Sequence, residues 1–138
     1  MRNIDEKTLD ELRRSARAAA ENAYAPYSKF YVGAALLFED GTVVTGCNVE
    51  NVSYGLTSCA ERNALCRAVS ERGAGQKIVA VAVTNRAGAP CSPCGACRQV
   101  LSEFAAEDAV VTFPWTGGTE TRLLRELLPY GFGLEKPR

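Results

Sequence analysis

A loop rich in turn-forming residues gives way to a helical pattern at Pro93-Cys94-Gly95-Ala96-Cys97-Arg98-Gln99. Apolar residues recur at helical spacing beyond this point, so we predict a helix over residues 94–106. Cys94 and Cys97 are three positions apart and therefore share one face of that helix. The stretch thus places two thiols close together at a helix N-terminus.

A second stretch, Ser58-Cys59-Ala60-Glu61-Arg62, opens another predicted helix. Ser58 is the expected N-cap, and the helix extends to about Arg72, where Gly73 and Gly75 end it. A thiol at a helix N-terminus meets unpaired N–H groups and the positive end of the helix dipole. Both effects lower the pKa of the thiol and prepare the thiolate to bind a metal ion.

The remaining elements follow from hydrophobic patterns on either side of these two helices. An amphipathic helix over residues 5–23 precedes a β-hairpin, and one strand follows each cysteine-bearing helix. This alternation predicts an α/β fold with helices packed on a largely β sheet. We expect strands at residues 31–38, 42–45, 77–84 and 109–113, a last short helix at 121–128, and a further strand near 115–119, which the Gly117-Gly118 pair disfavours.

Size and composition limit the class of protein. The chain has 138 residues, of which 46% are hydrophobic, enough for one sizeable core, so we expect a single domain over residues 1–138. Its 16 basic and 16 acidic residues give zero net charge, which argues against a nucleic acid polymer as partner. An apolar signal core and a run of about 18 apolar residues are both absent, so we predict a cytoplasmic protein that does not bind a membrane.

Histidine is absent, whereas six cysteines are present. The absence of histidine excludes histidine-dependent catalytic triads and every zinc site that contains histidine. In a cytosolic chain, cysteines indicate metal ligands, catalytic groups or small buried side chains rather than disulfides. Thiolates from Cys59, Cys94 and Cys97 would leave the fourth tetrahedral position of a zinc ion open to water, which is typical of a catalytic site.

Glu61 and Arg62 lie directly beside the first of these cysteines. Zn²⁺ and three thiolates carry a net charge of minus one, which hydroxide in the open position makes minus two, so the site needs positive charge nearby. We predict that Arg62, with the two helix dipoles, supplies this charge by hydrogen bonding to a ligand sulfur. Glu61 is the expected general base, which takes a proton from the zinc-bound water and returns it to the substrate.

Cys91 leaves two other interpretations open. With Cys94 and Cys97 it has the spacing of an iron–sulfur run, for which Cys59 offers a fourth ligand. As a fourth zinc ligand, Cys91 would instead close the site and make it a structural module without catalysis. The other two cysteines, Cys47 and Cys66, are expected to be small core residues.

Four ordered motifs resemble the small, homotetrameric type of cytidine deaminase over nearly the whole chain. One pair of motifs matches the deaminase pattern of a ligand two positions before Glu, followed later by Pro-Cys-x-x-Cys, with cysteine in place of histidine. The resemblance implies a three-layer α-β-α fold with a central mixed five-stranded sheet, one zinc ion per subunit, and a homotetramer whose active sites are completed across interfaces. The motifs are Tyr27-Ser28-Lys29-Phe30-Tyr31-Val32-Gly33-Ala34-Ala35, Cys47-Asn48-Val49-Glu50-Asn51, Cys59-Ala60-Glu61-Arg62 and Pro93-Cys94-Gly95-Ala96-Cys97-Arg98-Gln99.

The resemblance also implies the reaction, which is hydrolysis of free cytidine and 2′-deoxycytidine to uridine and 2′-deoxyuridine plus ammonia in pyrimidine salvage. Hydroxide activated by zinc attacks C4 of the base, and Glu61 moves the protons. The nearest rival is a deaminase of another aminopyrimidine nucleoside, such as blasticidin S. The segment Asn48-Val49-Glu50-Asn51 favours a ribose instead.

Roles for the remaining motif residues are likewise implied by the resemblance. An amide beside a carboxylate suits the hydroxyl groups of a sugar, so this pair fits a nucleoside without a 5′-phosphate. In the implied site, Phe30 packs on the pyrimidine, Asn48 and Glu50 hold the ribose hydroxyls, Ala60 contacts the base through its backbone, and Tyr54 and Phe132 reach the pocket of a neighbouring subunit.

Overall fold

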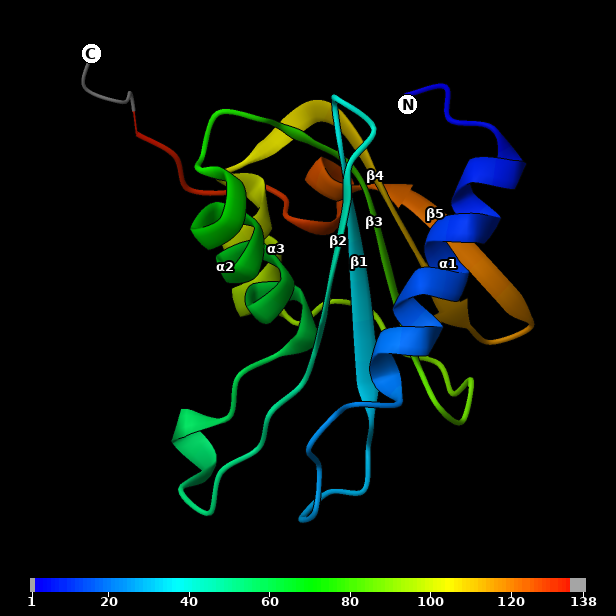
Figure 1. Ribbon diagram of the computed structural model, residues 1–138. Helices are drawn as coiled ribbons and strands as arrows, with labels where there is room; N and C mark the ends of the chain where they lie inside the picture. The colour runs from blue at the N-terminus through cyan, green and yellow to red at the C-terminus, as the bar shows by residue number, and fades with distance from the viewer. Residues whose placement is uncertain (1, 135–138) are drawn as a thin grey trace.

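A mixed sheet forms the centre of the computed structural model (Figure 1), which describes residues 2–134; Met1 and residues 135–138, which the predicted domain includes, lie outside the described part. The strand order is β2-β1-β3-β4-β5. Strands β3 and β4 are parallel, and the other neighbours are antiparallel. The strands are β1 (Val32–Phe38), β2 (Val43–Cys47), β3 (Ile78–Asn85), β4 (Ala105–Trp115) and β5 (Gly118–Leu123).

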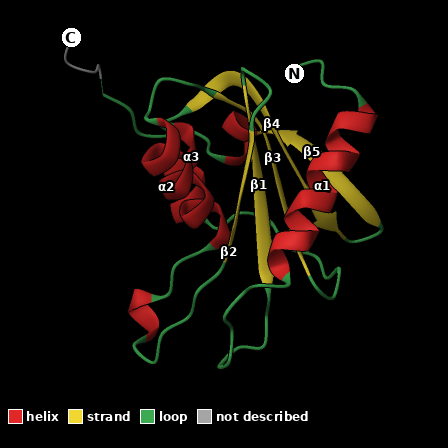
Figure 2. Cartoon of the chain, viewed as in Figure 1, coloured by secondary structure: helices red, strands yellow, loops and turns green. Residues whose placement is uncertain are grey.

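Helices cover both faces of the sheet and make three layers (Figures 1 and 2). Helix α1 (Glu6–Ala20) packs on one face, and α2 (Ala60–Arg72) and α3 (Gly95–Ser102) pack on the other. This arrangement confirms the predicted α/β fold with a five-stranded mixed sheet. Among residues 2–134, no helix has the length and apolar character needed to cross a membrane.

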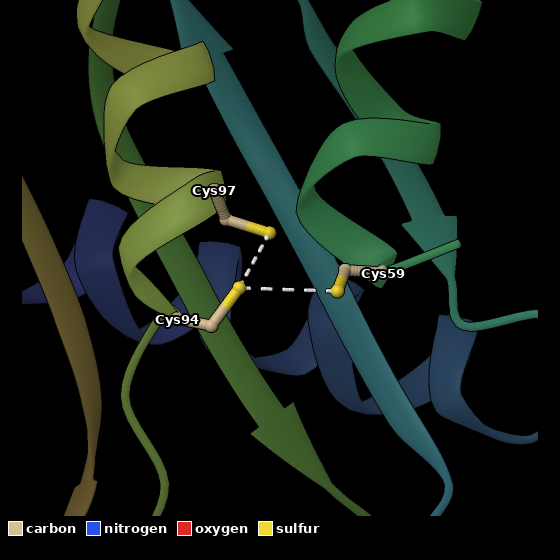
Figure 3. Close-up of side chains that lie close together, drawn as sticks. All are labelled: Cys59, Cys94 and Cys97. Carbon is tan, nitrogen blue, oxygen red and sulfur yellow. Dashed lines mark hydrogen bonds between the residues drawn. The ribbon is translucent and has the colours of Figure 1, made fainter. Parts of the chain in front are cut away.

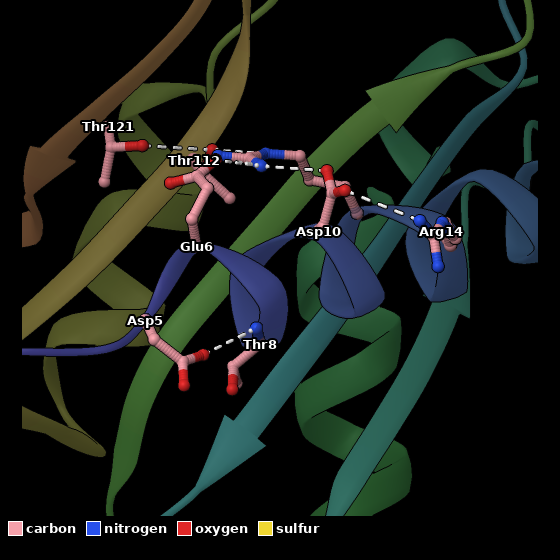
Figure 4. Close-up of polar contacts among 8 residues, drawn as sticks. Asp5, Glu6, Thr8, Asp10, Arg14, Thr112 and Thr121 are labelled. Atoms are coloured by element: carbon pink, nitrogen blue, oxygen red, sulfur yellow. Dashed lines mark hydrogen bonds and ion pairs between the residues drawn. The ribbon is translucent and has the colours of Figure 1, made fainter.

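Helix α1 is fixed at its start and along one face. The side chain of Asp5 accepts a hydrogen bond of 2.8 Å from the backbone N–H of Thr8 and so caps the helix (Figure 4). Farther along, Arg13 Nε donates to Thr112 Oγ1 at 3.0 Å, and Thr121 Oγ1 lies 3.2 Å from the same atom. These contacts satisfy the buried hydroxyl of Thr112 and join α1 to β4 and β5 (Figure 4).

Close packing sets the distance between helices and sheet at two glycines. A Cβ atom at Gly46 in β2 would lie 2.4 Å from the backbone nitrogen of Ala64 in α2. A Cβ atom at Gly33 in β1 would lie 1.9 Å from the backbone oxygen of Ala16 in α1. Only glycine therefore permits these approaches, and Gly46 brings α2 close to the end of β2.

The C-terminal part of the fold corrects the sequence prediction. The predicted helix over residues 121–128 is wrong, because residues up to Leu123 pair with β4 and only Leu124–Leu127 form a short 3-10 helix. Gly117 and Gly118, which disfavoured a strand, both have positive φ angles: Gly117 lies with Thr116 in the tight turn after β4, and Gly118 pairs with Trp115 as the first residue of β5. Pairing with β4 overrides the local helical spacing. Helix α3 likewise ends at Ser102 rather than at residue 106, because β4 begins at Ala105, which pairs with Ile78 of β3.

Candidate active site

Three cysteine sulfurs meet where α2 and α3 begin (Figure 3). Cys59 and Cys94 are the N-cap residues of these helices, and Cys97 lies in the first turn of α3. The Sγ of Cys94 lies 4.0 Å from that of Cys59 and 3.4 Å from that of Cys97. With Zn–S bonds of about 2.3 Å, tetrahedral geometry separates two ligand sulfurs by about 3.8 Å. The three side chains therefore fit a zinc ion with a fourth position left for water.

The N-cap position differs from the prediction by one residue. Ser58 was the expected cap of α2, but Cys59 occupies that position. Ser58 Oγ instead donates to Asn63 Oδ1 at 2.5 Å. Neither Cys59 nor Cys94 uses its side chain to cap its helix, so both sulfurs remain available to a metal at the positive ends of two helix dipoles.

Electrostatic coupling within the cluster favours a thiolate at Cys59. The pKa of Cys59 is lowered to about 5, mainly by its hydrogen bond with Cys97 and further by the guanidinium of Arg62. Burial acts in the opposite direction and raises this pKa, but its effect is smaller. The same hydrogen bond with Cys59, together with burial, raises the pKa of Cys97. One sulfur thus ionises at the expense of another until a bound cation stabilises all of them as thiolates.

Arg62 brings its charge to the cluster from the first turn of α2. Its Nη2 donates to Cys59 Sγ at 3.4 Å and lies 3.5 Å from the backbone oxygen of Thr57. Within the described part of the chain, Arg62 Nε is the one buried side-chain nitrogen or oxygen that has no hydrogen-bond partner. The structure thus places the guanidinium beside a sulfur, where the charge argument requires it.

Glu61 is nearly fully buried, with 4% of its surface exposed, and it lines the same cavity as Cys59 and Cys94. Burial is the main cause that raises the pKa of its carboxyl group. The metal-binding group formed by the described residues comprises the three cysteines without this carboxylate. Glu61 therefore lies beside the metal position but outside the group of three cysteines.

The cavity next to the sulfurs has a volume of about 290 Å³. That value lies near the lower limit for small-molecule sites, which span about 300 to 1,000 Å³. Residues from β1, β3, the start of α2 and the loops around the metal site form its walls. Beyond Glu61, Cys59 and Cys94, they are Ser28, Phe30, Val32, Asn48, Glu50, Thr57, Ala60, Val83, Cys91 and Ser92.

Asn48 and Glu50 hold the loop that presents Phe30. Asn48 Oδ1 accepts from the backbone N–H of Val32, and its Nδ2 donates to the carbonyl of Phe30, both at 2.8 Å. Glu50 accepts from the N–H and hydroxyl of Ser28, and the hydroxyl bond is the main cause that lowers the pKa of Glu50. Neither the part played by Ser28 nor this supporting role is predicted from the sequence, in which the only signal is the proximity of Ser28 to Phe30.

Tyr54 and Phe132 do not line this pocket of their own chain. Tyr54 is 74% exposed, and its ring centroid lies 5.9 Å from that of Tyr27. Phe132 is 71% exposed, and its carbonyl accepts from Gln99 Nε2 at 2.9 Å. Both residues therefore leave most of their surface exposed to solvent.

The remaining cysteines lie outside the sulfur cluster. Cys91 is a half-buried residue of the pocket wall, and its Sγ accepts from Asn85 Nδ2 at 3.3 Å. Among residues 2–134, the metal-binding group contains three cysteines and excludes Cys91, which supports neither the iron–sulfur nor the closed zinc interpretation. The expectation that Cys66 is a core residue is wrong, because it is exposed on α2, and Cys47 is half-buried.

Comparison with known proteins gives a family for this site. The family model described as "Cytidine and deoxycytidylate deaminase zinc-binding region" matches residues 6–113, which include all three cysteines. The chain belongs to this deaminase family.

Two relatives of the deaminase are named cytidine deaminase. The one from Mycobacterium tuberculosis is 49% identical over 124 residues, which cover 90% of this chain and 89% of that protein. The one from Halalkalibacterium halodurans is 48% identical over 123 residues, which cover 88% and 92%.

Solved structures of cytidine deaminases share the fold of this deaminase. The crystal structure from Mycobacterium tuberculosis superimposes with a TM-score of 0.83 at 46% identity, covering 96% of this chain and all of that one (100%). The structure from Burkholderia pseudomallei gives a TM-score of 0.79 at 46% identity, covering 89% and 98%. This deaminase is a zinc-dependent hydrolase, and its group of three cysteines is positioned to bind the zinc ion.

Proposed function

We propose that this protein hydrolyses the exocyclic amine of free cytidine and 2′-deoxycytidine, giving uridine or 2′-deoxyuridine and ammonia. The observation that carries the proposal is a buried Glu61 in one cavity with Cys59 and Cys94, while Asn48 and Glu50 line the same cavity. A metal position, a proton carrier and two sugar-binding side chains then lie in a single pocket. These are the parts that nucleoside deamination requires.

In the mechanism we propose, Cys59, Cys94 and Cys97 hold zinc, whose role when bound is to make water a stronger nucleophile toward C4 of the base. The Glu61 carboxylate accepts the proton that water loses. It delivers this proton to N3 of the ring, then accepts the second proton of the water from the oxygen that has added at C4 and delivers it to the departing amine. Burial of Glu61 serves this task, because a raised pKa lets the carboxyl group carry a proton between the two steps.

Substrate choice in this proposal depends on the opposite end of the pocket. Phe30 offers a ring face to the pyrimidine and Ala60 offers its backbone, while Asn48 and Glu50 take the ribose hydroxyls. The pocket-lining residues that the structure describes include neither lysine nor arginine. A 5′-phosphate would therefore lack a counter-charge, which supports a free nucleoside as the substrate.

We also propose that the active enzyme is a homotetramer in which Tyr54 and Phe132 complete a neighbour's pocket. The support lies in exposed apolar side chains next to Tyr54 in the chain, where Val52 is 77% exposed and Leu56 is 70% exposed. A monomer in solution would leave these side chains in water. Light scattering should give four times the mass of the 14.8 kDa chain, and a monomer with full activity would contradict the proposal.

We place the enzyme in the cytoplasm, in pyrimidine salvage, as a further part of the proposal. All six cysteines are free, and the metal site needs three of them as thiolates. An oxidising compartment would favour disulfides among such closely spaced sulfurs. Fractionation of the producing cell, with the activity assay below as readout, would test this location.

The test of the proposed reaction is the loss of cytidine's ultraviolet absorbance with purified protein. Turnover should disappear after zinc is removed with a chelator and return when zinc is added. The same assay with blasticidin S ranks the rival substrate. If zinc-loaded, folded protein turns over blasticidin S but not cytidine, the ribose assignment is wrong; if it turns over neither, the proposed reaction is wrong.

A further inference from the structure

The two helices that carry the metal site share a local arrangement. Four residues after the first cysteine of each helix, a side chain bonds back to the carbonyl immediately before that cysteine. In α2, Asn63 Nδ2 donates to the carbonyl of Ser58 at 3.3 Å. In α3, Arg98 Nε donates to the carbonyl of Pro93 at 2.7 Å. The two helix starts are therefore built in the same way.

Each of these side chains also holds a second segment of the chain. Asn63 Nδ2 donates to the carbonyl of Cys47 at 2.8 Å, where β2 ends. Arg98 Nη1 donates to the carbonyl of Leu127 in the last 3-10 helix at 2.8 Å, and its Nη2 donates to Ser92 Oγ at 3.1 Å. Each loop is thereby tied both to its own helix and to a neighbouring element.

The carbonyls of Ser58 and Pro93 belong to the peptide groups that directly precede Cys59 and Cys94. Cys59 and Cys94 are N-cap residues with extended backbone, at ψ values of 153° and 163°. Their own amides therefore lie outside the regular helical hydrogen bonds. The carbonyl of Ser58 also accepts from the backbone N–H of Val49 at 2.9 Å, so Asn63 adds a second anchor to the peptide group before Cys59. Rotation of the peptide group before either cysteine would move the sulfur, and these side-chain bonds restrict that rotation. Cys97 needs no such anchor, because it lies inside the first turn of α3.

We propose that Asn63 and Arg98 are matched positioning residues, which set the separation of the Cys59 and Cys94 sulfurs for zinc by fixing the peptide group before each cysteine. Neither side chain touches the metal position or the substrate. The inference rests on the zinc site and is independent of which base the enzyme deaminates. It assigns the 4.0 Å separation of these two sulfurs to the pair of anchors.

Arg67 provides a matched control on the same helix. It lies one turn beyond Asn63, and its Nη1 donates to the carbonyl of Thr45 at 3.1 Å. Arg67 therefore joins α2 to β2, as Asn63 does, but it holds neither cysteine loop. A purely structural contribution is shared by both residues, whereas an effect on the metal site belongs to Asn63 alone.

The test measures zinc affinity in full-length Asn63→Leu, Arg98→Met and Arg67→Met by competition with a chromophoric chelator. Loss of an outer hydrogen bond to a metal site typically weakens binding by about 10- to 100-fold, which we expect for the first two variants. Arg67→Met should bind zinc as the unchanged protein does. The proposal is overturned if the first two variants keep full affinity, or if Arg67→Met loses as much.

Two milder substitutions separate the positioning role of these side chains from the effect of their charge. They also replace any of the first variants that fails to fold. Arg98→Lys keeps the positive charge but cannot supply the three donated bonds of the guanidinium. We expect its zinc affinity to lie between those of Arg98→Met and the unchanged protein. Full recovery by lysine would overturn the positioning role. For the other helix, Asn63→Ser keeps a small polar group too short to reach both carbonyls, and it should weaken zinc binding.

A spectroscopic readout completes the test without any use of turnover. Co²⁺ in place of zinc absorbs visible light in a way that reports the geometry of its sulfur ligands. The Asn63 and Arg98 variants should show a shifted or broadened Co²⁺ spectrum, and Arg67→Met should not. An unchanged spectrum in the first two would contradict the inference. A protein that binds metal normally yet fails to deaminate cytidine would refute the proposed reaction and leave this test intact.

Discussion

Cys59 and Cys94 are each the N-cap of a different helix, and their sulfur atoms lie 4.0 Å apart. The two helices lie side by side on one face of the sheet, so the metal position lies where two helix dipoles converge (Figure 3). A site of three thiolates has an excess of negative charge. The converging dipoles and the Arg62 guanidinium beside Cys59 are the positive charges that would offset it when zinc binds.

Removal of zinc should leave the fold intact. Helices α2 and α3 are held by a core that includes Leu36, Leu65, Val81 and Leu101, none of which depends on the metal. We expect apoprotein prepared with a chelator to keep its far-ultraviolet circular dichroism and to unfold at a lower temperature than the zinc form. If the apoprotein loses its helical signal, the metal is a structural element rather than a catalytic one.

Glu61→Gln should abolish turnover while preserving the metal. Glutamine matches the size of the side chain and still forms hydrogen bonds, but it cannot accept and return a proton. We expect the rate with cytidine to fall by about 10²- to 10⁴-fold or more, the usual contribution of a general acid–base group. Zinc content, measured by atomic absorption, should stay at one ion per chain. Near-normal turnover would show that another group carries the protons.

Cys91→Ser should keep its zinc. The Cys91 sulfur bonds to Asn85 and lies outside the group of three cysteines, so serine at this position removes no ligand. Cys97→Ser is the matched comparison, because it removes a buried sulfur of that group and should weaken zinc binding strongly. Equal loss of zinc from both proteins would restore the closed four-cysteine site as an explanation.

Glu50→Gln should raise the KM for cytidine and change kcat less. The carboxylate accepts bonds from Tyr27 and Ser28, and in the proposed site it also accepts from a ribose hydroxyl. Hydrogen bonds to a charged group are worth about 1.5 to 3 kcal/mol, so a rise in KM of roughly ten- to a hundredfold is expected. Steady-state kinetics decide the outcome. A fall in kcat at constant KM would place Glu50 in the chemical step instead.

The sequence predicted the metal site better than it predicted the end of the fold. The group Cys59, Cys94 and Cys97 could be found because short spacings and helix-start patterns are local signals, and the structure brings these sulfurs together. The further strand expected near residues 115–119 overlaps only the start of the strand Gly118–Leu123, and the rest of that strand could not be found, because its stability comes from pairing with β4 rather than from its own residues. Local spacing favoured a helix there, and pairing across the sheet prevailed.

The residues of the site also differ in whether local sequence signals or long-range contacts determine their positions. Glu61 and Arg62 are neighbours of a ligand in the sequence, so their positions beside the cluster followed from helix geometry. Asn48 forms hydrogen bonds with Phe30 and Val32, which lie in a distant part of the sequence. No local sequence pattern predicts these contacts. The roles of Phe30, Asn48, Glu50, Ala60, Tyr54 and Phe132 in binding substrate remain predictions.

Gly46→Ala should destabilise the protein and disturb the metal site together. The added methyl group would lie 2.4 Å from the backbone nitrogen of Ala64 and 2.7 Å from the backbone oxygen of Ala60, so α2 must move away from β2. Overpacking of this kind costs about 1 to 3 kcal/mol, and backbone neighbours place this case at the upper end. Because Ala60 directly follows Cys59, the shift should also weaken zinc binding.

Gly75→Ala is the control for this prediction, since a Cβ atom there meets nothing within 4 Å. Its free energy of unfolding should equal that of the unchanged protein or exceed it by up to about 1 kcal/mol, because alanine restricts the unfolded chain. Urea unfolding of both zinc-free proteins gives the comparison, and chelator competition gives the zinc affinity. Equal stability of the two variants would mean that α2 can retreat from β2 without cost, and the close approach at Gly46 would then not be what positions Cys59.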